Sequence, residues 1–263
     1  MRWSSRRGTL CLYPSAPVLT IEVATSDPGA ATRPVTVTLS VSGRLLDRFD
    51  LRRGGLTRSV FMPEALWYRP PPRAIPFGEC LPDRASVPLT VEVSRLWSPY
   101  VKGSSDGRLL GVAVFAPSFR TLRPGEDLGL YPAEFVEGRS ARWMGARASV
   151  FVALPAERSR VVVPVRAPKP RLGTRPVRVE AFWNEQNVVA LSLSDDRWHD
   201  LRLEAGGSSR QGILTLEVDQ TWPPNTLGIA GDWGHVGLQV GAIRAEPIGP
   251  AADTPSGGAP AER

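Results

Sequence analysis

The stretch LTVEVSRLWSP at residues 89–99 returns as LTLEVDQTWPP at residues 214–224, with the same three alternating apolar positions, the same tryptophan and the same final proline. In the first copy Leu89, Val91 and Val93 alternate with polar residues, which is typical of a strand with one buried face. A proline follows the tryptophan in each copy, and because proline cannot donate to a sheet ladder, strand pairing is expected to stop there. Each copy is therefore predicted to be a strand that leaves its sheet through a Trp–Pro corner, where the indole covers the open end of a sandwich.

Three further landmarks occur in both halves of the chain, in the same order as this phrase. The offsets are 140, 142 and 126 residues, and 125 for the phrase itself. Four colinear patterns predict a tandem duplication. The fall from 142 to 125 places the extra length of the first unit in its Pro-rich segment 62–85, and a long loop on a compact scaffold is often functional. The landmarks are Arg2-Trp3 with Arg142-Trp143, Arg33-Pro34-Val35 with Arg175-Pro176-Val177, and Asp106 and Gly111 with Asp232 and Gly237.

Both units consist of short apolar runs separated by glycine-containing turns, and no stretch sustains helical periodicity over three turns. About seven strands at this spacing predict an all-β fold of two tandem antiparallel β-sandwich domains, jelly-roll-like in character. The expected strands are 8–13, 17–24, 34–41, 44–50, 57–61, 87–94 and 109–115 in unit one, and 147–154, 159–166, 176–183, 187–193, 198–203, 212–219 and 236–244 in unit two.

The predicted domain boundaries follow from the repeats and from local composition. Unit one covers residues 1–118 and lacks a counterpart of the segment that opens unit two, so we expect the chain to be part of a longer protein. A linker covers 119–127, and unit two covers 128–247, with its first strand expected within 116–141. The tail, 248–263, is rich in small residues, proline and glycine, and it is expected to be disordered.

The overall composition excludes several classes of protein. With 42% hydrophobic and 22% charged residues, the 263-residue chain is typical of a folded protein large enough for two cores. Its apolar runs, such as 161–165, are too short to cross a bilayer, so no direct membrane insertion is expected. The N-terminus lacks the continuous apolar core of a secretion signal. The net charge of +6 comes from arginines scattered among acids rather than from a basic stripe, so nucleic-acid binding is not expected.

The residues that carry most enzyme chemistry are few. The two cysteines, Cys11 and Cys80, allow either a disulfide or two buried thiols. No cluster of cysteine and histidine has metal-ligand spacing, and no phosphate-cradling or nucleophile motif is present, so we expect no metal, no cofactor and no enzyme activity. A hydrolase that uses Asp196 and His199 would require these two groups to converge in a pocket; as sequence, Asp195-Asp196 indicates a turn.

Two glutamates, Glu92 and Glu217, take the same place in both copies of the repeated phrase. Two carboxylates could serve as the catalytic pair of a glycoside hydrolase. Strand alternation, however, puts both side chains on the face opposite the apolar residues, where pairing with a neighbouring strand or with solvent is the simpler role.

The loop after the first Trp–Pro corner returns through SSDGRLLGVAV, residues 104–114. Asp106 is expected to accept backbone N–H groups in the turn, Arg108 to pair with it, and Gly111 to allow a close backbone approach. These residues form either a loop-closing device or, with Trp97, a ligand site, because aromatic side chains flanked by polar groups suit sugar recognition. The corresponding candidates of unit two are Trp222, Asp232 and Trp233, of which Trp233 is expected to be the most exposed.

The leading Arg-Trp strand, the Trp-x-Pro corner and the Asp-x-Arg-x-Leu-Gly-Val return resemble soluble β-sandwich modules of carbohydrate-binding or galactose-binding type. Such modules are attached to bacterial membrane glycosyltransferases and related cell-surface polysaccharide proteins. The resemblance implies a carbohydrate-related, extracytoplasmic or envelope-associated setting, without implying catalysis. Unit one carries it in Arg2, Trp3, Trp97, Pro99, Asp106, Arg108, Leu110 and Gly111, whereas unit two keeps Arg142, Trp143, Trp222, Pro224, Asp232 and Gly237 but has Gly234 in place of the arginine, between Trp233 and His235.

Together these features predict a non-catalytic protein of two tandem sandwiches that binds a glycan or docks onto a glycosyltransferase. The alternative is a structural or protein-interaction module with no small-molecule ligand. That alternative predicts a flat surface without an aromatic-lined groove, and an interface formed by the loop 62–85. Neither the oligomeric state nor the cellular compartment follows from the sequence.

Overall fold

The computed structural model describes residues 2–52, 54–62, 86–123, 125–167, 175–206, 210–229 and 234–248. In this part of the chain the regular elements are β-strands and three short 3-10 helices, and every strand pairing is antiparallel. The predicted class, an all-β antiparallel sandwich fold, is confirmed. The predicted long loop, apart from residue 62, and the predicted tail, apart from residue 248, lie outside the described residues.

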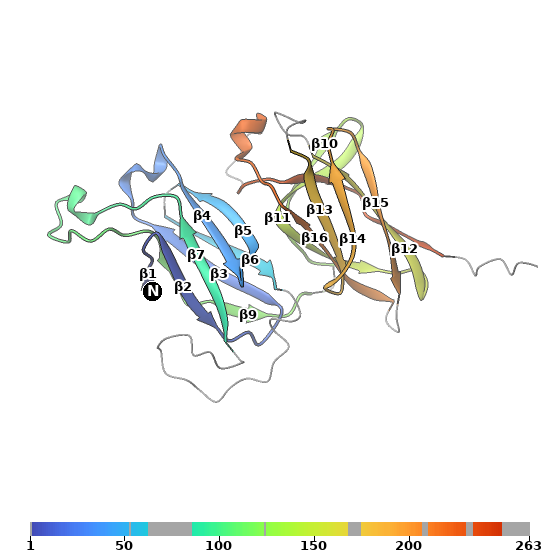
Figure 1. Ribbon diagram of the computed structural model, residues 1–263, viewed down its shortest axis with the longest axis horizontal. Coiled ribbons are helices and arrows are strands. Elements are labelled where there is room, and N and C mark those ends of the chain that lie inside the picture. Colours follow the sequence, from blue (N-terminus) through green and yellow to red (C-terminus); the bar gives the residue numbers. More distant parts are fainter. Residues whose placement is uncertain are drawn as a thin grey trace, which may run out of the picture.

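The first nine strands form the N-terminal sandwich: β1 (Arg2–Trp3), β2 (Arg7–Leu12), β3 (Val18–Thr25), β4 (Val35–Val41), β5 (Arg44–Leu51), β6 (Gly54–Phe61), β7 (Val87–Val93), β8 (Ala113–Val114) and β9 (Ser118–Arg120). One sheet has the order β1-β8-β3-β6, with β9 added to β3, and the other has the order β2-β7-β4-β5 (Figure 1). Alternate side chains of these strands, such as Val37, Leu39 and Val41, fill one core between the two sheets.

The remaining strands form the C-terminal sandwich: β10 (Asp127–Val136), β11 (Arg139–Ala153), β12 (Arg158–Arg166), β13 (Val177–Trp183), β14 (Gln186–Leu193), β15 (His199–Gly206), β16 (Gln211–Val218), β17 (Leu238–Gly241) and β18 (Arg244–Pro247). Their order is β14-β13-β16-β11-β17-β12-β15, with β10 on β11 and β18 on β12. The long strand β11 pairs with β17 near its start and with β16 near its end. The sheet therefore folds over at β11, and its two halves enclose a core of their own.

The two sandwiches are built on the same pairing scheme. Cross-strand partners in one correspond to cross-strand partners in the other at the offsets seen in the sequence. A common origin of the two units stays a prediction, as do the domain boundaries. The correspondences are Arg2–Val114 with Arg142–Val240, Arg7–Glu92 with Arg147–Glu217, and Val35–Leu51 with Val177–Leu193.

Three elements differ from the strands expected from the sequence. The short strand β9 was not expected, and the run 236–244 contains β17 and the start of a separate strand, β18. Strand β11 begins at Arg139 rather than at residue 147, because its first part forms a hairpin with β10. The hairpin turn contains Glu137 and Gly138, both with positive φ. Among the described residues, the N-terminal sandwich has no counterpart of β10.

Two smaller findings bear on the sequence predictions. Cys11 is disulfide-bonded, and Cys80, the only other cysteine of the chain, lies outside the described residues. None of the helices in the described part of the chain has the length and hydropathy of a transmembrane span.

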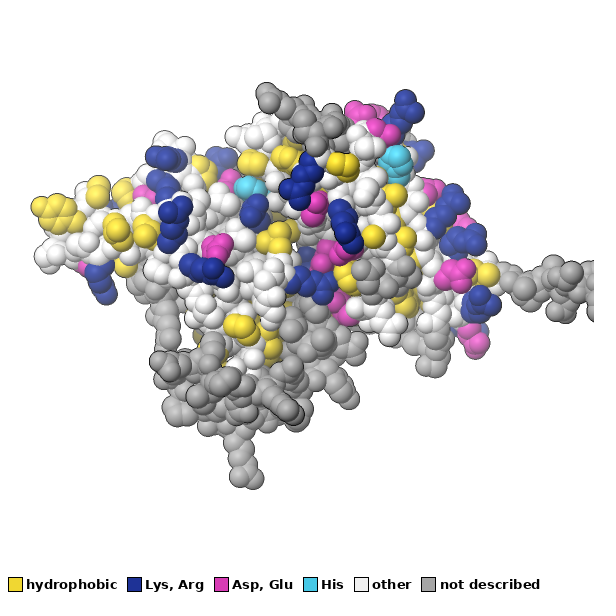
Figure 2. Space-filling model, viewed as in Figure 1, with side chains coloured by type: hydrophobic (Ala, Val, Ile, Leu, Met, Phe, Trp, Pro, Cys, Tyr) yellow, Lys and Arg dark blue, Asp and Glu magenta, His cyan; other side chains and the backbone are white. Residues whose placement is uncertain are grey.

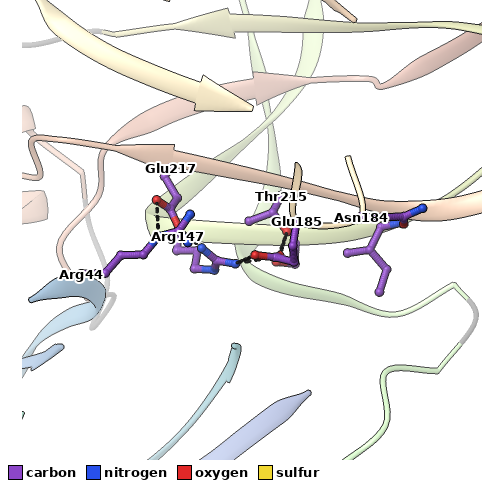
Figure 3. A network of polar contacts seen from close by, with 8 residues as sticks. Arg44, Arg147, Asn184, Glu185, Thr215 and Glu217 are labelled. Atoms are coloured by element: carbon purple, nitrogen blue, oxygen red, sulfur yellow. Dashed lines mark hydrogen bonds and ion pairs between the residues drawn. The ribbon is translucent and has the colours of Figure 1, made fainter. Parts of the chain in front are cut away.

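A cluster of charged side chains joins the two sandwiches (Figure 3). Arg147 on β11 has a side chain only 1% exposed, and it pairs with Glu185 at 2.8 Å and with Glu217, its cross-strand neighbour on β16. Arg44 on β5 reaches across from the N-terminal sandwich, binds Glu217 at 2.8 Å and places its guanidinium 4.6 Å from the centre of the Phe182 ring. Burial lowers the pKa of Arg147, and the charge of Glu185 opposes this effect. A guanidinium buried this deeply is tolerated because carboxylates face it.

Two further polar contacts join the sandwiches. Arg58 on β6 pairs with Asp47 at 2.6 Å and donates a hydrogen bond to the hydroxyl oxygen of Tyr131, from β10, at 3.5 Å. His235 is 7% exposed, and its Nε2 lies 3.2 Å from a carboxylate oxygen of Asp50 on β5. Both contacts combine one partner from each sandwich, so together with the arginine cluster they hold the two bodies in one arrangement.

We call the contacts of Arg44, Arg147, Arg58 and His235 the joint between the sandwiches. The corresponding ion pairs of the two sandwiches provide a matched test of this joint. The side chains of Arg7 and Glu92 are 71% and 48% exposed, whereas those of Arg147 and Glu217 are 1% and 14% exposed. We expect Glu217→Gln to lower the free energy of unfolding by about 3 kcal/mol, because it leaves a buried guanidinium short of one carboxylate. Glu92→Gln should cost less than about 1 kcal/mol. Urea unfolding measures both, and equal losses would contradict the proposed role of the joint.

Candidate functional site

The loop after β7 carries the site predicted for unit one. Strand β7 ends at Val93, before the Trp–Pro corner, and Trp97 then forms an isolated bridge with Leu110 on the returning chain. The next element is the 3-10 helix η2 (Pro99–Lys102), which begins at the proline of the corner. Lys102 folds back so that its Nζ lies 5.6 Å from the centre of the Trp97 ring. The half-buried indole thus lies at the base of a loop that projects from the end of the sandwich (Figure 1).

Asp106 and Arg108 bind each other in the exposed part of this loop. The backbone N–H of Arg108 donates to Asp106 at 3.0 Å, and its guanidinium donates to the same carboxylate at 2.7 Å. The side-chain hydrogen bond from Arg108 lowers the pKa of Asp106 to about 2. Gly111 permits the expected close approach, because a Cβ there would lie 2.7 Å from the carbonyl oxygen of Ser5. These contacts close the loop, as the sequence predicted, and they leave Asp106 and Arg108 satisfied by each other.

The corresponding loop of the C-terminal sandwich repeats the corner. Trp222 forms an isolated bridge with Val236, and its half-buried side chain packs against the core. The 3-10 helix η3 (Pro224–Leu227) follows, just as η2 follows the first corner. The other two candidates, Asp232 and Trp233, lie outside the described residues. A ligand role for either loop therefore stays a prediction.

An open groove of about 850 Å³ lies on the C-terminal sandwich, away from both loops. Val161, Val163 and Val165 of β12 point into the core, so Pro164, which lines the groove, points outward. Pro164 pairs with Asp200 on β15, another lining residue. The groove therefore lies on the outer face of the folded sheet. Its polar and aromatic lining includes Arg139, Trp198, His199, Asp200, Arg202 and Arg244.

Trp198 gives this groove an aromatic surface. Its ring is half-buried, and its indole nitrogen is buried without a hydrogen-bond partner among the described residues. The exposed part of the ring is therefore carbon. The guanidinium of Arg139 lies 5.8 Å from the ring centre. His199 hydrogen-bonds to Asp195 at 2.7 Å, which lowers the pKa of Asp195. An apolar ring bordered by oriented polar groups is the lining expected of a site for a polar organic ligand.

A second cleft, of about 570 Å³, lies between the two sandwiches. Asp50 and Arg52 line it from the N-terminal sandwich, and Pro223 and Thr226 line it from the loop of the C-terminal one. Asp50 is engaged by His235, whose hydrogen bond lowers the pKa of that carboxyl. This cleft therefore belongs to the joint.

The structure does not bring together the groups expected of a hydrolase. His199 binds Asp195 rather than Asp196, whose backbone carbonyl accepts a hydrogen bond from an arginine. Within the described ranges, no three side chains of cysteine, histidine, aspartate or glutamate are grouped as metal ligands. Glu92 and Glu217 each pair with the arginine opposite them on the neighbouring strand, which confirms the cross-strand role expected for them.

The groove was missed by sequence analysis because its residues come from distant strands. Arg139 opens β11, Trp198 precedes β15 and Arg244 opens β18, and no local motif links them. The sequence singles out other tryptophans because they stand beside repeated prolines and aspartates. The signal that exists is weaker: alternation along β15 and β12 points Arg202 and Pro164 outward, and only the strand pairing brings them together.

A comparison with protein-family models and with curated proteins gives no match. Among solved structures, the chain is similar to the M60 catalytic domain with the CBM51-1 and CBM51-2 domains of Clostridium perfringens ZmpB, with 8% identity, 90% of this chain covered and a TM-score of 0.23. The chain spans only 33% of the length of that protein.

Two other similar structures are a CBM22-1–CBM22-2 tandem and a plant ectodomain. The tandem, from Paenibacillus barcinonensis Xyn10C, has 10% identity, coverage of 89% of this chain and 82% of that one, and a TM-score of 0.24. The ANX2 ectodomain of Arabidopsis thaliana has 7% identity, coverage of 92% and 83%, and the same TM-score of 0.24. Scores this low assign no function, so the proposals below rest on the residues of this chain.

The close approach at Gly111 can be tested against another glycine of the same loop. A Cβ at Gly111 would lie 2.5 Å from the Ser4 hydroxyl oxygen, whereas a Cβ at Gly107 meets nothing within 4 Å. We expect Gly111→Ala to lower the free energy of unfolding by about 1–3 kcal/mol through overpacking. Gly107→Ala should change it by less than about 0.5 kcal/mol. Thermal unfolding followed by circular dichroism measures both, and a neutral Gly111→Ala would disprove the close approach.

Proposed function

We propose that this chain is a non-catalytic binding module that takes a glycan in the groove beside Trp198. The observation that carries the proposal is the lining of that groove, where a half-buried indole lies among charged and polar side chains. Sugars present apolar C–H faces and a rim of hydroxyl groups. The faces can stack on an aromatic ring, and the hydroxyls can bond to arginine, aspartate and histidine.

The size and placement of the groove support this proposal. A volume of about 850 Å³ is within the usual range for ligand sites, and the groove is open rather than enclosed, which suits a polymer. Several lining residues, among them Asp200 and Arg202, belong to strands that are fixed by the sheet ladder. A site on paired strands loses little conformational entropy when a ligand binds. We also propose that the chain is an accessory module of an envelope glycosyltransferase. This part of the proposal rests on the sequence resemblance.

Substitution of Trp198 tests the proposal. If a sugar stacks on this ring, Trp198→Ala should raise the dissociation constant for a bound glycan at least about tenfold, since an aromatic anchor typically contributes about 2 kcal/mol. Trp198→Phe should retain most of the affinity. Screening on a glycan array, followed by titration calorimetry with the best ligand, measures the effect.

Two controls separate the groove from the loop predicted by the sequence. Tyr100→Ala removes an aromatic side chain that is 70% exposed and lies outside the groove, and it should leave affinity unchanged. Trp97→Ala tests the loop. Loss of binding in Trp97→Ala with full binding in Trp198→Ala would place the ligand at the loop, and retention on no glycan would contradict the proposal as a whole.

A second candidate function, contact with another protein, is favoured by the free end of the N-terminal sandwich. Leu109 takes the place that His235 has in the C-terminal loop, yet it is 64% exposed whereas His235 is 7% exposed against the neighbouring sandwich. Tyr100 and Val101 are 70% and 75% exposed on the same loop (Figure 2 shows apolar side chains gathered at this projecting end). The position of His235, which contacts the neighbouring sandwich, is thus occupied in the N-terminal sandwich by an exposed apolar residue, Leu109.

The contact can be tested with a second copy of the chain as the partner. We expect sedimentation velocity to show association that increases with concentration, because the free end presents three uncovered apolar side chains. Leu109→Asp should abolish it. Phe135→Asp, at a residue that is 80% exposed on the other sandwich, should not. A chain that stays monomeric at all concentrations would contradict this contact.

A further inference from the structure

The groove beside Trp198 carries more positive than negative charge. Of the described residues, three arginines line it, Arg139, Arg202 and Arg244, against one carboxylate, that of Asp200. His199, which also lines it, is bound to Asp195. The question is whether these cations are already neutralised within the chain or are available to a ligand.

Most strand arginines of this sandwich are neutralised by a neighbouring carboxylate. Arg202 binds Asp200 at 3.3 Å, so within the groove that acid is engaged. Arg139 and Arg244 have no carboxylate partner among the described residues, and the contact found for Arg139 is with the ring of Trp198. The neutralised strand arginines are Arg142, Arg147, Arg158, Arg166, Arg178 and Arg202.

The strand pairing places two of the groove arginines in one row. Val162 on β12 is the partner of Arg202 on β15 and also the partner of Arg244 on β18. Directly paired residues point to the same face of a sheet, and two strand spacings amount to roughly 10 Å. Arg202 and Arg244 therefore extend from the outer face of the sheet on either side of Val162, and both line the groove.

We infer that the groove selects an anionic glycan, one that carries carboxylate, sulfate or phosphate groups on its sugar rings. This inference rests on the proposed glycan-binding function. Guanidinium groups match the oxygens of these anions with paired N–H donors, and such charge-assisted bonds are stronger than neutral ones. Trp198 supplies the surface for the ring, and Arg139 and Arg244 supply charge that no side chain of the described chain neutralises.

Two polymers with the same sugar backbone test the inference: polygalacturonate, which carries a carboxylate on each ring, and its fully methyl-esterified form, which is uncharged. We expect the charged polymer to bind at least about tenfold more tightly at low salt, and this preference to shrink as the salt concentration rises. Arg244→Gln and Arg139→Gln should each lower affinity for the charged polymer severalfold and lower affinity for the uncharged one much less, because glutamine can still bond to a hydroxyl group but carries no charge. Arg210→Gln, which removes the same charge from an exposed position outside the groove, should have no effect.

The outcomes separate the inference from the function on which it rests. Equal, salt-independent binding of both polymers, with no effect of Arg244→Gln, would overturn the inference and leave the glycan-binding function standing. Equally tight binding of polyglutamate, a polyanion without sugar rings, would also overturn it, because the groove would then be recognising charge alone. Binding of neither polymer overturns the inference for uronates, and if no glycan of an array binds either, the proposed function fails with it.

Discussion

The joint between the two sandwiches depends on one buried guanidinium. Arg147 is removed from water because the N-terminal sandwich covers it, and the cost of burying its charge is offset by Glu185 and Glu217. Glu217 is shared with Arg44 of the other sandwich, so the carboxylate that neutralises Arg147 also ties the two bodies together. This network favours one relative placement, because a rotation of either body would break the pair between Arg44 and Glu217.

The two sandwiches contain corresponding Arg–Glu pairs that differ in how far they are exposed to solvent. Arg7 and Glu92 pair across strands as Arg147 and Glu217 do, but their side chains are largely exposed. The buried pair thus differs from the exposed one in two ways: Arg44 of the neighbouring body binds Glu217, and Glu185, which corresponds to Gly43 in the N-terminal sandwich, binds Arg147. The two loops also differ in exposure, since Leu109 is exposed and His235 is covered.

The sequence predicted those features that depend on neighbours along the chain. Alternation located the strands, proline marked the end of β7, and Asp106, Arg108 and Gly111 have the contacts expected of a closed turn. The joint and the groove could not be predicted in this way. Glu217 and Glu92 occupy the same place in the repeated phrase, so nothing local indicates that only one is buried. The row of Arg202 and Arg244 exists only through the shared partner Val162 on a third strand.

The two proposed surfaces, the groove beside Trp198 and the loop after β7, lie at opposite ends of the molecule. The joint determines how they are placed relative to each other. The groove is lined from β12 and β15, whereas the loop that carries Tyr100 and Leu109 projects from the far end of the N-terminal sandwich (Figure 1). A glycan in the groove therefore does not compete with a protein at the loop. Three polar contacts cross between the sandwiches, those of Arg44 with Glu217, Arg58 with Tyr131 and His235 with Asp50, and they favour one position and orientation of an occupant of one end relative to an occupant of the other. Flexibly linked sandwiches could bind the same two occupants but would not fix their relative placement. Burial of the Arg147 charge lowers the stability of the fold, and the defined placement of the two sandwiches is the gain that offsets this loss.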